Sequence, residues 1–138
     1  MKRKRILAMI LAVASCLSLA VGVSAANTVA RKATDFRDYD RTAWYAEAVS
    51  AAVDNGLLYG KSATVIDPNG DMTRAEMAAI INRSFGCYKI TDISQYKDVS
   101  KSKWYYKDVA LAVQMGTYNG RSASAMAPDA PISRQEAM

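Results

Sequence analysis

The chain contains no histidine among its 138 residues, and it has only two cysteines and three prolines. Histidine is the commonest general base and a frequent metal ligand, and no serine or cysteine here is accompanied by a recognisable base. We therefore expect neither an enzyme nor a cofactor. An intramolecular disulfide is not expected either, because Cys16 falls in a segment predicted to be removed. Cys87 is then alone and is interpreted as a small buried hydrophobe.

The N-terminus has the three zones of a secretory signal peptide. Four basic residues at positions 2–5 precede an apolar run over 6–23, and small residues follow as a cleavage site. We predict a signal peptide over 1–26 and a secreted mature chain that has no membrane segment. Two alternatives stay open. The run of about 18 residues could remain as a membrane anchor, or lipoprotein processing could occur at Cys16, although the residues that follow it stay apolar.

Loss of this segment also changes the charge of the protein. The formal net charge of +5 falls to about +1 once the four basic residues at positions 2–5 are removed. A nucleic-acid-binding protein needs lysine and arginine gathered on one face. That class of function is therefore excluded.

The most informative feature is an internal repeat. Residues 36–78 align without a gap to residues 96–138, at an offset of 60 positions. The pairs of identical residues include Asp38/Asp98, Trp44/Trp104, Gly56/Gly116, Gly60/Gly120, Pro68/Pro128, Arg74/Arg134 and Glu76/Glu136. Tryptophan, glycine and proline are uncommon and have different structural roles, so their joint alignment indicates a tandem repeat.

Each repeat is predicted to be helix, loop, helix, which makes the fold class all-α. The first helix places apolar residues on one face and ends at a glycine, and its members in the first repeat are Trp44, Ala48, Val49, Ala52, Val53 and Gly56. The second helix begins with a capping box of Thr73 and Glu76. Its apolar face is predicted to be Met77, Ile80, Ile81, Ser84 and Phe85, and Gly86 is predicted to end it.

The second repeat starts its last helix with Ser133 and Glu136 and reaches Met138 after about one turn. So short a helix does not stabilise itself, and we expect a fragment of a longer protein or a helix completed by a partner. The predicted organisation is a signal peptide (1–26), a linker (27–35), a first repeat (36–86), a second linker (87–95) and an incomplete second repeat (96–138).

These motifs resemble the S-layer homology family. Its repeats run roughly Phe-x-Asp-Val, Trp, an alanine-rich helix ending in Gly, a second Gly, Phe-x-Pro and Ile-Thr-Arg-Ala-Glu. The matching stretches here are Phe36-Arg37-Asp38-Tyr39, Ile66-Asp67-Pro68, Met72-Thr73-Arg74-Ala75-Glu76, Tyr96-Lys97-Asp98-Val99, Met126-Ala127-Pro128 and Ile132-Ser133-Arg134-Gln135-Glu136. The departures are Ile66 and Met126 for Phe, Tyr39 for Val and Gln135 for Ala. Family members usually carry three repeats, packed with binding grooves between them.

The resemblance implies non-covalent attachment to the bacterial cell wall or S-layer through an anionic secondary cell-wall polymer, often one with a pyruvate ketal on an amino sugar. The tryptophans suit a sugar ring, the arginines and Lys61 suit a carboxylate, and the glycines allow close approach of a ligand. The expected contacts are Trp44, Gly60, Lys61, Arg74, Trp104, Gly120, Arg121 and Arg134.

Other interpretations of these residues stay open. The tryptophans are alternatively core residues, and Arg74 and Arg134 are alternatively solvated residues of the first helical turn. Asp38 and Asp98 are interpreted as turn or cap residues. For the whole chain, the alternative functions are an S-layer lattice or protein-interaction module, with self-association through the repeats, and the N-terminal anchor of a longer surface enzyme.

Asp67, Asn69 and Asp71 alternate as in the first half of an EF-hand calcium loop. The sixth position is Met72 where glycine is required, and the twelfth is Ala78 where a bidentate glutamate is required. The carboxylates are also not repeated 60 residues later. No metal site is predicted.

Overall fold

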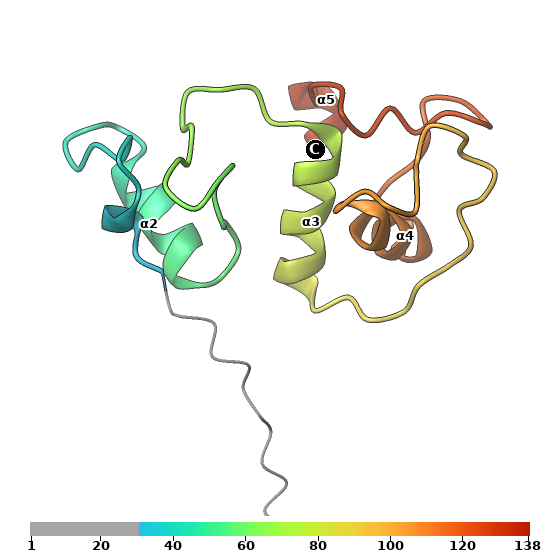
Figure 1. The fold of residues 1–138 in the computed structure, drawn as a ribbon, viewed down its shortest axis with the longest axis horizontal. Helices are drawn as coiled ribbons and strands as arrows, with labels where there is room; N and C mark the ends of the chain where they lie inside the picture. The colour runs from blue at the N-terminus through green and yellow to red at the C-terminus, as the bar shows by residue number, and fades with distance from the viewer. Residues whose placement is uncertain (1–30) are drawn as a thin grey trace, which may run out of the picture.

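A computed structural model describes residues 31–138 (Figure 1), so the predicted signal peptide and Cys16 lie outside the described residues. The elements are a 3-10 turn η1 (Ala33–Asp35) and the helices α2 (Ala46–Asp54), α3 (Arg74–Phe85), α4 (Tyr106–Met115) and α5 (Arg134–Ala137). Over 31–138 no β-strand forms, although Thr73 and Pro131 make an isolated β-bridge. The all-α prediction is confirmed.

Both predicted capping boxes are present. At the start of α3, the Thr73 hydroxyl accepts a hydrogen bond from the Glu76 amide at 3.2 Å, and the Glu76 carboxylate accepts one from the Thr73 amide at 2.8 Å. Ser133 and Glu136 repeat this pair at the start of α5. Each pair satisfies two amides that the helix itself leaves unpaired. The sequence therefore predicted the start of both helices correctly.

The buried face of α3 differs from the predicted one. Phe85 is 71% exposed, whereas the residues buried along the helix are Arg74, Ala75, Ala78, Ala79 and Asn82. The prediction was wrong because it favoured large apolar side chains, while the helix turns its small residues toward α4. Alanines allow the two helix backbones to approach closely. The Asn82 amide also donates a hydrogen bond to the Asp108 carbonyl in α4 at 2.8 Å.

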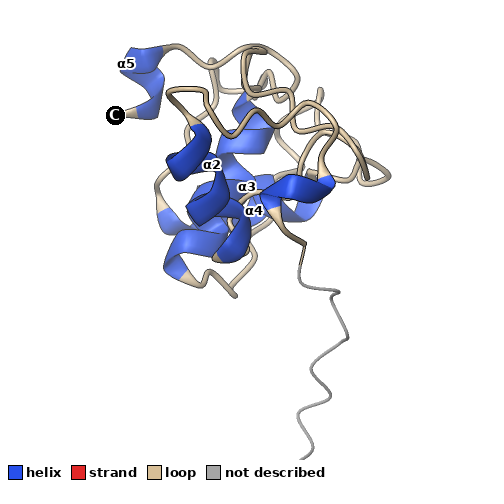
Figure 2. Ribbon diagram, turned by 90° about the vertical axis from the view of Figure 1, so that its left-hand side faces the viewer, coloured by secondary structure: helices blue, strands red, loops and turns tan. Residues whose placement is uncertain are grey.

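The main core crosses the boundary between the two repeats. Helix α3 of the first repeat packs against α4 of the second, and the two lie together in both views (Figures 1 and 2). The core joins Ala75 and Ala78 to residues of the second repeat, namely Ile93, Val99, Tyr105, Val109, Ala110, Ala112, Tyr118 and Met126. A smaller cluster of Phe36, Val53 and Ile66 lies with α2. The sequence repeat is therefore not the packing unit, because α3 packs mainly with the second repeat.

An aspartate near the start of each repeat holds its loop in shape. The Asp98 carboxylate accepts hydrogen bonds from the amides of Met126 and Ala127, and Asp38 makes the same pair of contacts in the first repeat. Burial raises the pKa of Asp98, but these two amides outweigh that effect and lower it below the ordinary value. Ala127 is left-handed, with φ of 53°. The aspartates thus act as turn residues, as interpreted from the sequence.

Candidate functional site

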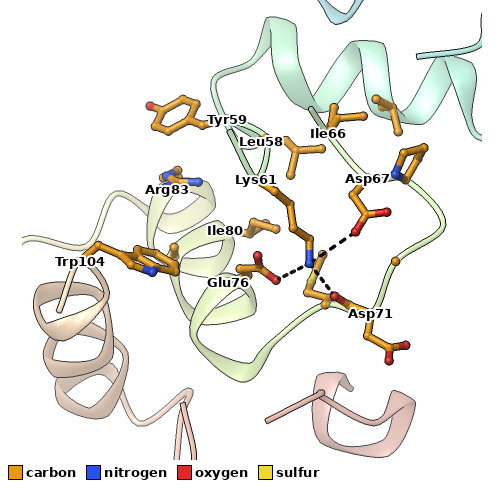
Figure 3. A pocket seen from close by; sticks show the side chains of 16 residues that line it. Leu58, Tyr59, Lys61, Ile66, Asp67, Asp71, Glu76, Ile80, Arg83 and Trp104 are labelled. Atoms are coloured by element: carbon orange, nitrogen blue, oxygen red, sulfur yellow. Dashed lines mark hydrogen bonds and ion pairs between the residues drawn. The ribbon is translucent and has the colours of Figure 1, made fainter. Parts of the chain in front are cut away.

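A pocket of about 550 Å³ lies between the two repeats (Figure 3). The first repeat provides most of its wall, from α2, the loop that follows it and α3. The second repeat contributes Trp104, which stands just before α4. The lining residues are Val49, Leu58, Tyr59, Gly60, Lys61, Ile66, Asp67, Pro68, Gly70, Asp71, Met72, Glu76, Ala79, Ile80, Arg83 and Trp104. The site therefore depends on the packing of α3 against α4.

Trp104 is a surface residue of this pocket. Its side chain is 61% exposed, and its ring meets the ring of Tyr105 edge to face at a centroid distance of 5.4 Å. Trp44, its counterpart in the first repeat, is 90% exposed and makes the same contact with Tyr45 at 5.8 Å. These exposures exclude the interpretation that the tryptophans fill the core. An exposed indole face is available to an apolar ligand surface.

At one end of the pocket Lys61 is surrounded by oxygen atoms. Its ammonium donates a hydrogen bond to the Asp71 carbonyl at 2.8 Å and lies 3.5 Å from the Glu76 carboxylate and 4.0 Å from that of Asp67 (Figure 3). The positive charge of Lys61 is therefore balanced inside the protein.

The other end of the pocket holds a cation that the sequence analysis missed. The guanidinium of Arg83 lies over the ring of Tyr59, 4.1 Å from its centroid, and Nη1 donates a hydrogen bond to the Leu57 carbonyl at 2.8 Å. Spacing along α3 could have identified it. Glu76, Ile80 and Arg83 are separated by four and three residues, so they share a face of the helix, and all three line the pocket.

Gly60 lines the pocket at a point where the chain is tightly packed. Its φ is +81°, and a Cβ there would lie 2.5 Å from Phe36 Cε1 and 2.7 Å from the Val65 carbonyl oxygen. A Cβ at Gly120 would meet the ring of Tyr96 at 2.5 Å. Both glycines are therefore required by the packing of their own repeat, whether or not a ligand is bound.

Arg74 is placed in the contact between repeats and does not line the pocket. It is 5% exposed, and Nη2 and Nε donate hydrogen bonds to the carbonyls of Asn119 at 2.7 Å and Met126 at 3.2 Å. Nη1 pairs with Glu136 Oε1 at 2.6 Å, and the guanidinium lies over the ring of Tyr118 at 4.7 Å. Every nitrogen of the guanidinium thus has a partner in the second repeat.

Arg121 repeats the environment of Lys61 one repeat later. Its guanidinium lies 3.4 Å from the Glu136 carboxylate and 3.3 Å from the Pro131 carbonyl, as Lys61 lies against Glu76 and the Asp71 carbonyl. Arg134, the counterpart of Arg74, is exposed on α5. Of the eight contacts predicted from the sequence, the structure brings three together in the pocket, namely Gly60, Lys61 and Trp104. The other five lie outside its lining.

Among residues 31–138, no group of three or more carboxylate, cysteine or histidine side chains is placed to hold a metal ion. No helix in this part of the chain is long and apolar enough to cross a membrane. Cys87 is partly buried just after α3.

The sequence matches the S-layer homology domain twice, over residues 35–78 and 95–138. It is 37% identical over 106 residues to the Surface-layer 125 kDa protein of Lysinibacillus sphaericus, which covers 74% of this chain and 9% of the relative. It is 27% identical over 135 residues to an endoglucanase of Bacillus sp. (strain KSM-635), and the match covers 96% of this chain and 14% of the relative. A third relative is endo-1,4-beta-xylanase A of Thermoanaerobacterium saccharolyticum, which is 26% identical over 106 residues. That match covers 77% of this chain and 9% of the relative.

The chain thus spans 14% or less of the length of these relatives. S-layer homology domains are non-catalytic modules that anchor proteins to the cell wall, and the location expected from the sequence, secreted and wall-associated, agrees with this. The two matches together cover more than half of the chain, and the repeats that carry them pack through α3 and α4. The protein belongs to the S-layer homology family.

Proposed function

We propose that this protein attaches non-covalently to the bacterial cell wall by binding an anionic secondary cell-wall polymer in the pocket between its repeats. The observation that carries the proposal is the position of Trp104. Its indole is 61% exposed and lines a pocket whose other wall comes from the first repeat. A sugar ring can stack on this face while its polar groups contact the loop that carries Gly60 and Lys61.

The other contacts predicted from the sequence remain part of the proposal, although they do not line the pocket. Trp44, Gly120, Arg121 and Arg134 occupy the corresponding positions of the other repeat, and we propose that they contact the same polymer. Arg74 is the weakest member of the set, because its guanidinium is already paired with the second repeat. The chain itself is proposed to have no catalytic role, and a pyruvate ketal is one form that the acidic group of the polymer can take.

The test is a pull-down on purified cell-wall sacculi, before and after chemical removal of the secondary polymer. The protein is expected to bind the intact walls, and Trp104→Ala is expected to bind about two- to tenfold more weakly, since loss of an aromatic stacking contact costs about 0.5–1.5 kcal/mol. Tyr88→Ala is the control, because it removes an exposed aromatic ring that lies outside the pocket and outside the proposed contacts. Equal binding of the unaltered protein to stripped walls would contradict the proposal.

A second candidate function follows from the relatives. Several are enzymes, including the endoglucanase and the xylanase, and the chain matches only a small share of their length. We propose that these repeats serve as the anchor of a longer surface protein, and the gene sequence downstream of Met138 would test this directly.

The competing role is an S-layer lattice module that self-associates, and sedimentation in the analytical ultracentrifuge tests it. Self-assembly without binding to wall polymer would favour it.

A further inference from the structure

We propose that Arg83 binds the acidic group of the wall polymer, and that this group carries a single negative charge. The inference rests on the proposed function and concerns the same pocket. It assigns a residue outside the eight contacts expected from the sequence, and it moves the recognition of charge from the start of α3 to its last turn.

The charges of the pocket are not evenly paired. The lining contains two cations, Lys61 and Arg83, and three carboxylates, Asp67, Asp71 and Glu76. Lys61 forms ion pairs with Glu76 and Asp67. Among residues 31–138, no ion pair involves Arg83. Arg83 is therefore the cation of the pocket whose charge remains available to a ligand.

The Arg83 guanidinium is held in place and keeps one edge free within the described chain. The ring of Tyr59 supports one face of it, and Nη1 is held by the Leu57 carbonyl. Within the described chain, the edge formed by Nε and Nη2 makes no hydrogen bond. These two N–H groups are parallel donors, which match the two oxygens of a carboxylate or a phosphodiester. Because Tyr59 and Leu57 already hold the side chain in place, binding costs little conformational entropy.

Arg83 lies at the same end of the pocket as Trp104 (Figure 3). Figure 3 shows Tyr59, Arg83 and Trp104 toward one end of the pocket and Lys61, Asp67 and Asp71 toward the other. A sugar stacked on Trp104 can thus place its acidic group on Arg83. Arg83 can neutralise one negative charge of the ligand, and the other charged side chains of the lining are one cation and three carboxylates, so a second negative charge on the ligand would be repelled. This favours a monoanion over a phosphate monoester.

The experiment measures the affinity of the full chain for extracted wall polymer in three forms. These are the native polymer, polymer whose carboxylates have been converted to neutral amides, and polymer whose phosphodiesters have been hydrolysed and whose resulting phosphate monoesters have been removed by a phosphatase. Arg83→Gln is expected to lower affinity for the native form about ten- to a hundredfold, the usual effect of losing a hydrogen-bonded charge pair. Arg83→Lys is expected to lose most of the same affinity, because lysine lacks the paired donors.

Removing the acidic group that Arg83 binds should lower the affinity of the unaltered protein by the same factor as Arg83→Gln does. The affinity of Arg83→Gln itself should not fall further. Sensitivity to amidation identifies a carboxylate, and sensitivity to phosphodiester cleavage identifies a phosphodiester. Arg41→Gln is the matched control, since Arg41 is exposed and outside the pocket. Tyr59→Leu provides a second variant should Arg83→Gln fold poorly, and it is expected to weaken binding several-fold.

The inference is overturned if Arg83→Gln and Tyr59→Leu both bind native polymer as tightly as the unaltered protein while Trp104→Ala does not. It is also overturned if Arg83→Gln weakens binding of the native and the neutralised polymers equally. Either result leaves the proposed function intact. Failure of the unaltered protein to bind the polymer at all would instead refute the proposed function.

Discussion

Arg74 Nη1 and Glu136 Oε1 lie 2.6 Å apart, although the two residues are separated by 62 positions in the sequence. Arg74 opens α3 of the first repeat, and Glu136 belongs to the capping box of α5 in the second. The same carboxylate also receives Arg121 at 3.4 Å. One glutamate therefore caps its own helix and connects the two repeats, whose packing forms the pocket.

Loss of Arg74 is expected to destabilise the protein more than loss of its counterpart. Arg74→Ala leaves the carbonyls of Asn119 and Met126 without their donor and removes an ion pair from a buried position. We expect the free energy of unfolding to fall by about 2–3 kcal/mol, measured by urea denaturation. Arg134→Ala is the matched control, and the same change at that exposed position is expected to stay within about 0.5 kcal/mol.

This comparison also separates the two roles of Arg74. The resemblance implied that it contacts the polymer, whereas its environment is that of a connection between repeats. An Arg74→Ala protein that melts like the unaltered protein but no longer binds cell walls would support the ligand role. One that melts early, and binds walls normally below its melting temperature, would support the structural role.

Acid is expected to weaken the Glu136 interactions over a defined range. The amide of Ser133 and the guanidinium of Arg121 hold the pKa of Glu136 at about 2, below its ordinary value of 4.5. Because the pKa is lower in the folded protein, the stabilisation is complete above about pH 4.5 and is lost as the pH falls toward 2. Glu136→Gln should therefore lower the melting temperature at pH 7, and this difference should disappear by about pH 2. A difference that is constant from pH 7 to pH 2 would contradict the prediction.

Ala127→Gly is expected to stabilise the protein. Ala127 is held at a φ of 53°, in the left-handed region that is unfavourable for alanine by about 1–2 kcal/mol. Glycine removes this strain but adds freedom to the unfolded chain, so the expected net gain is about 0.5–1 kcal/mol. Thermal or urea denaturation measures it. Ala123→Gly, at an exposed position of the same loop, is the control and should give no gain.

The local features of the fold were predictable from single residues and their spacing. Thr73 with Glu76, and Ser133 with Glu136, marked helix starts because a capping box needs only residues three apart. Gly86 marked the end of α3 for a similar reason, since a left-handed residue there favours glycine. These signals are local, so a single sequence contains them.

The candidate site was only partly predictable. Trp104 was identified because it recurs in the repeat, but its exposure and its position beside the first repeat depend on how α3 meets α4. Arg83 was missed because its counterpart position is not among the residues of the second repeat. Arg74 was expected in the site on the basis of the resemblance, and the structure instead pairs it across the repeats.

By itself, the sequence determined the tandem repeat, the all-α class, the helix starts and the family, because each depends on residue types at short or regular spacings. Only the tertiary structure decided which face of α3 is buried, that α3 packs with the following repeat, and which charges remain unpaired in the pocket. Those outcomes depend on contacts between residues tens of positions apart. Alanines such as Ala75 and Ala78 give little signal in the hydrophobic pattern of the sequence. Their small size nevertheless lets α3 and α4 approach closely. This packing brings Trp104 to the pocket that Arg83 also lines.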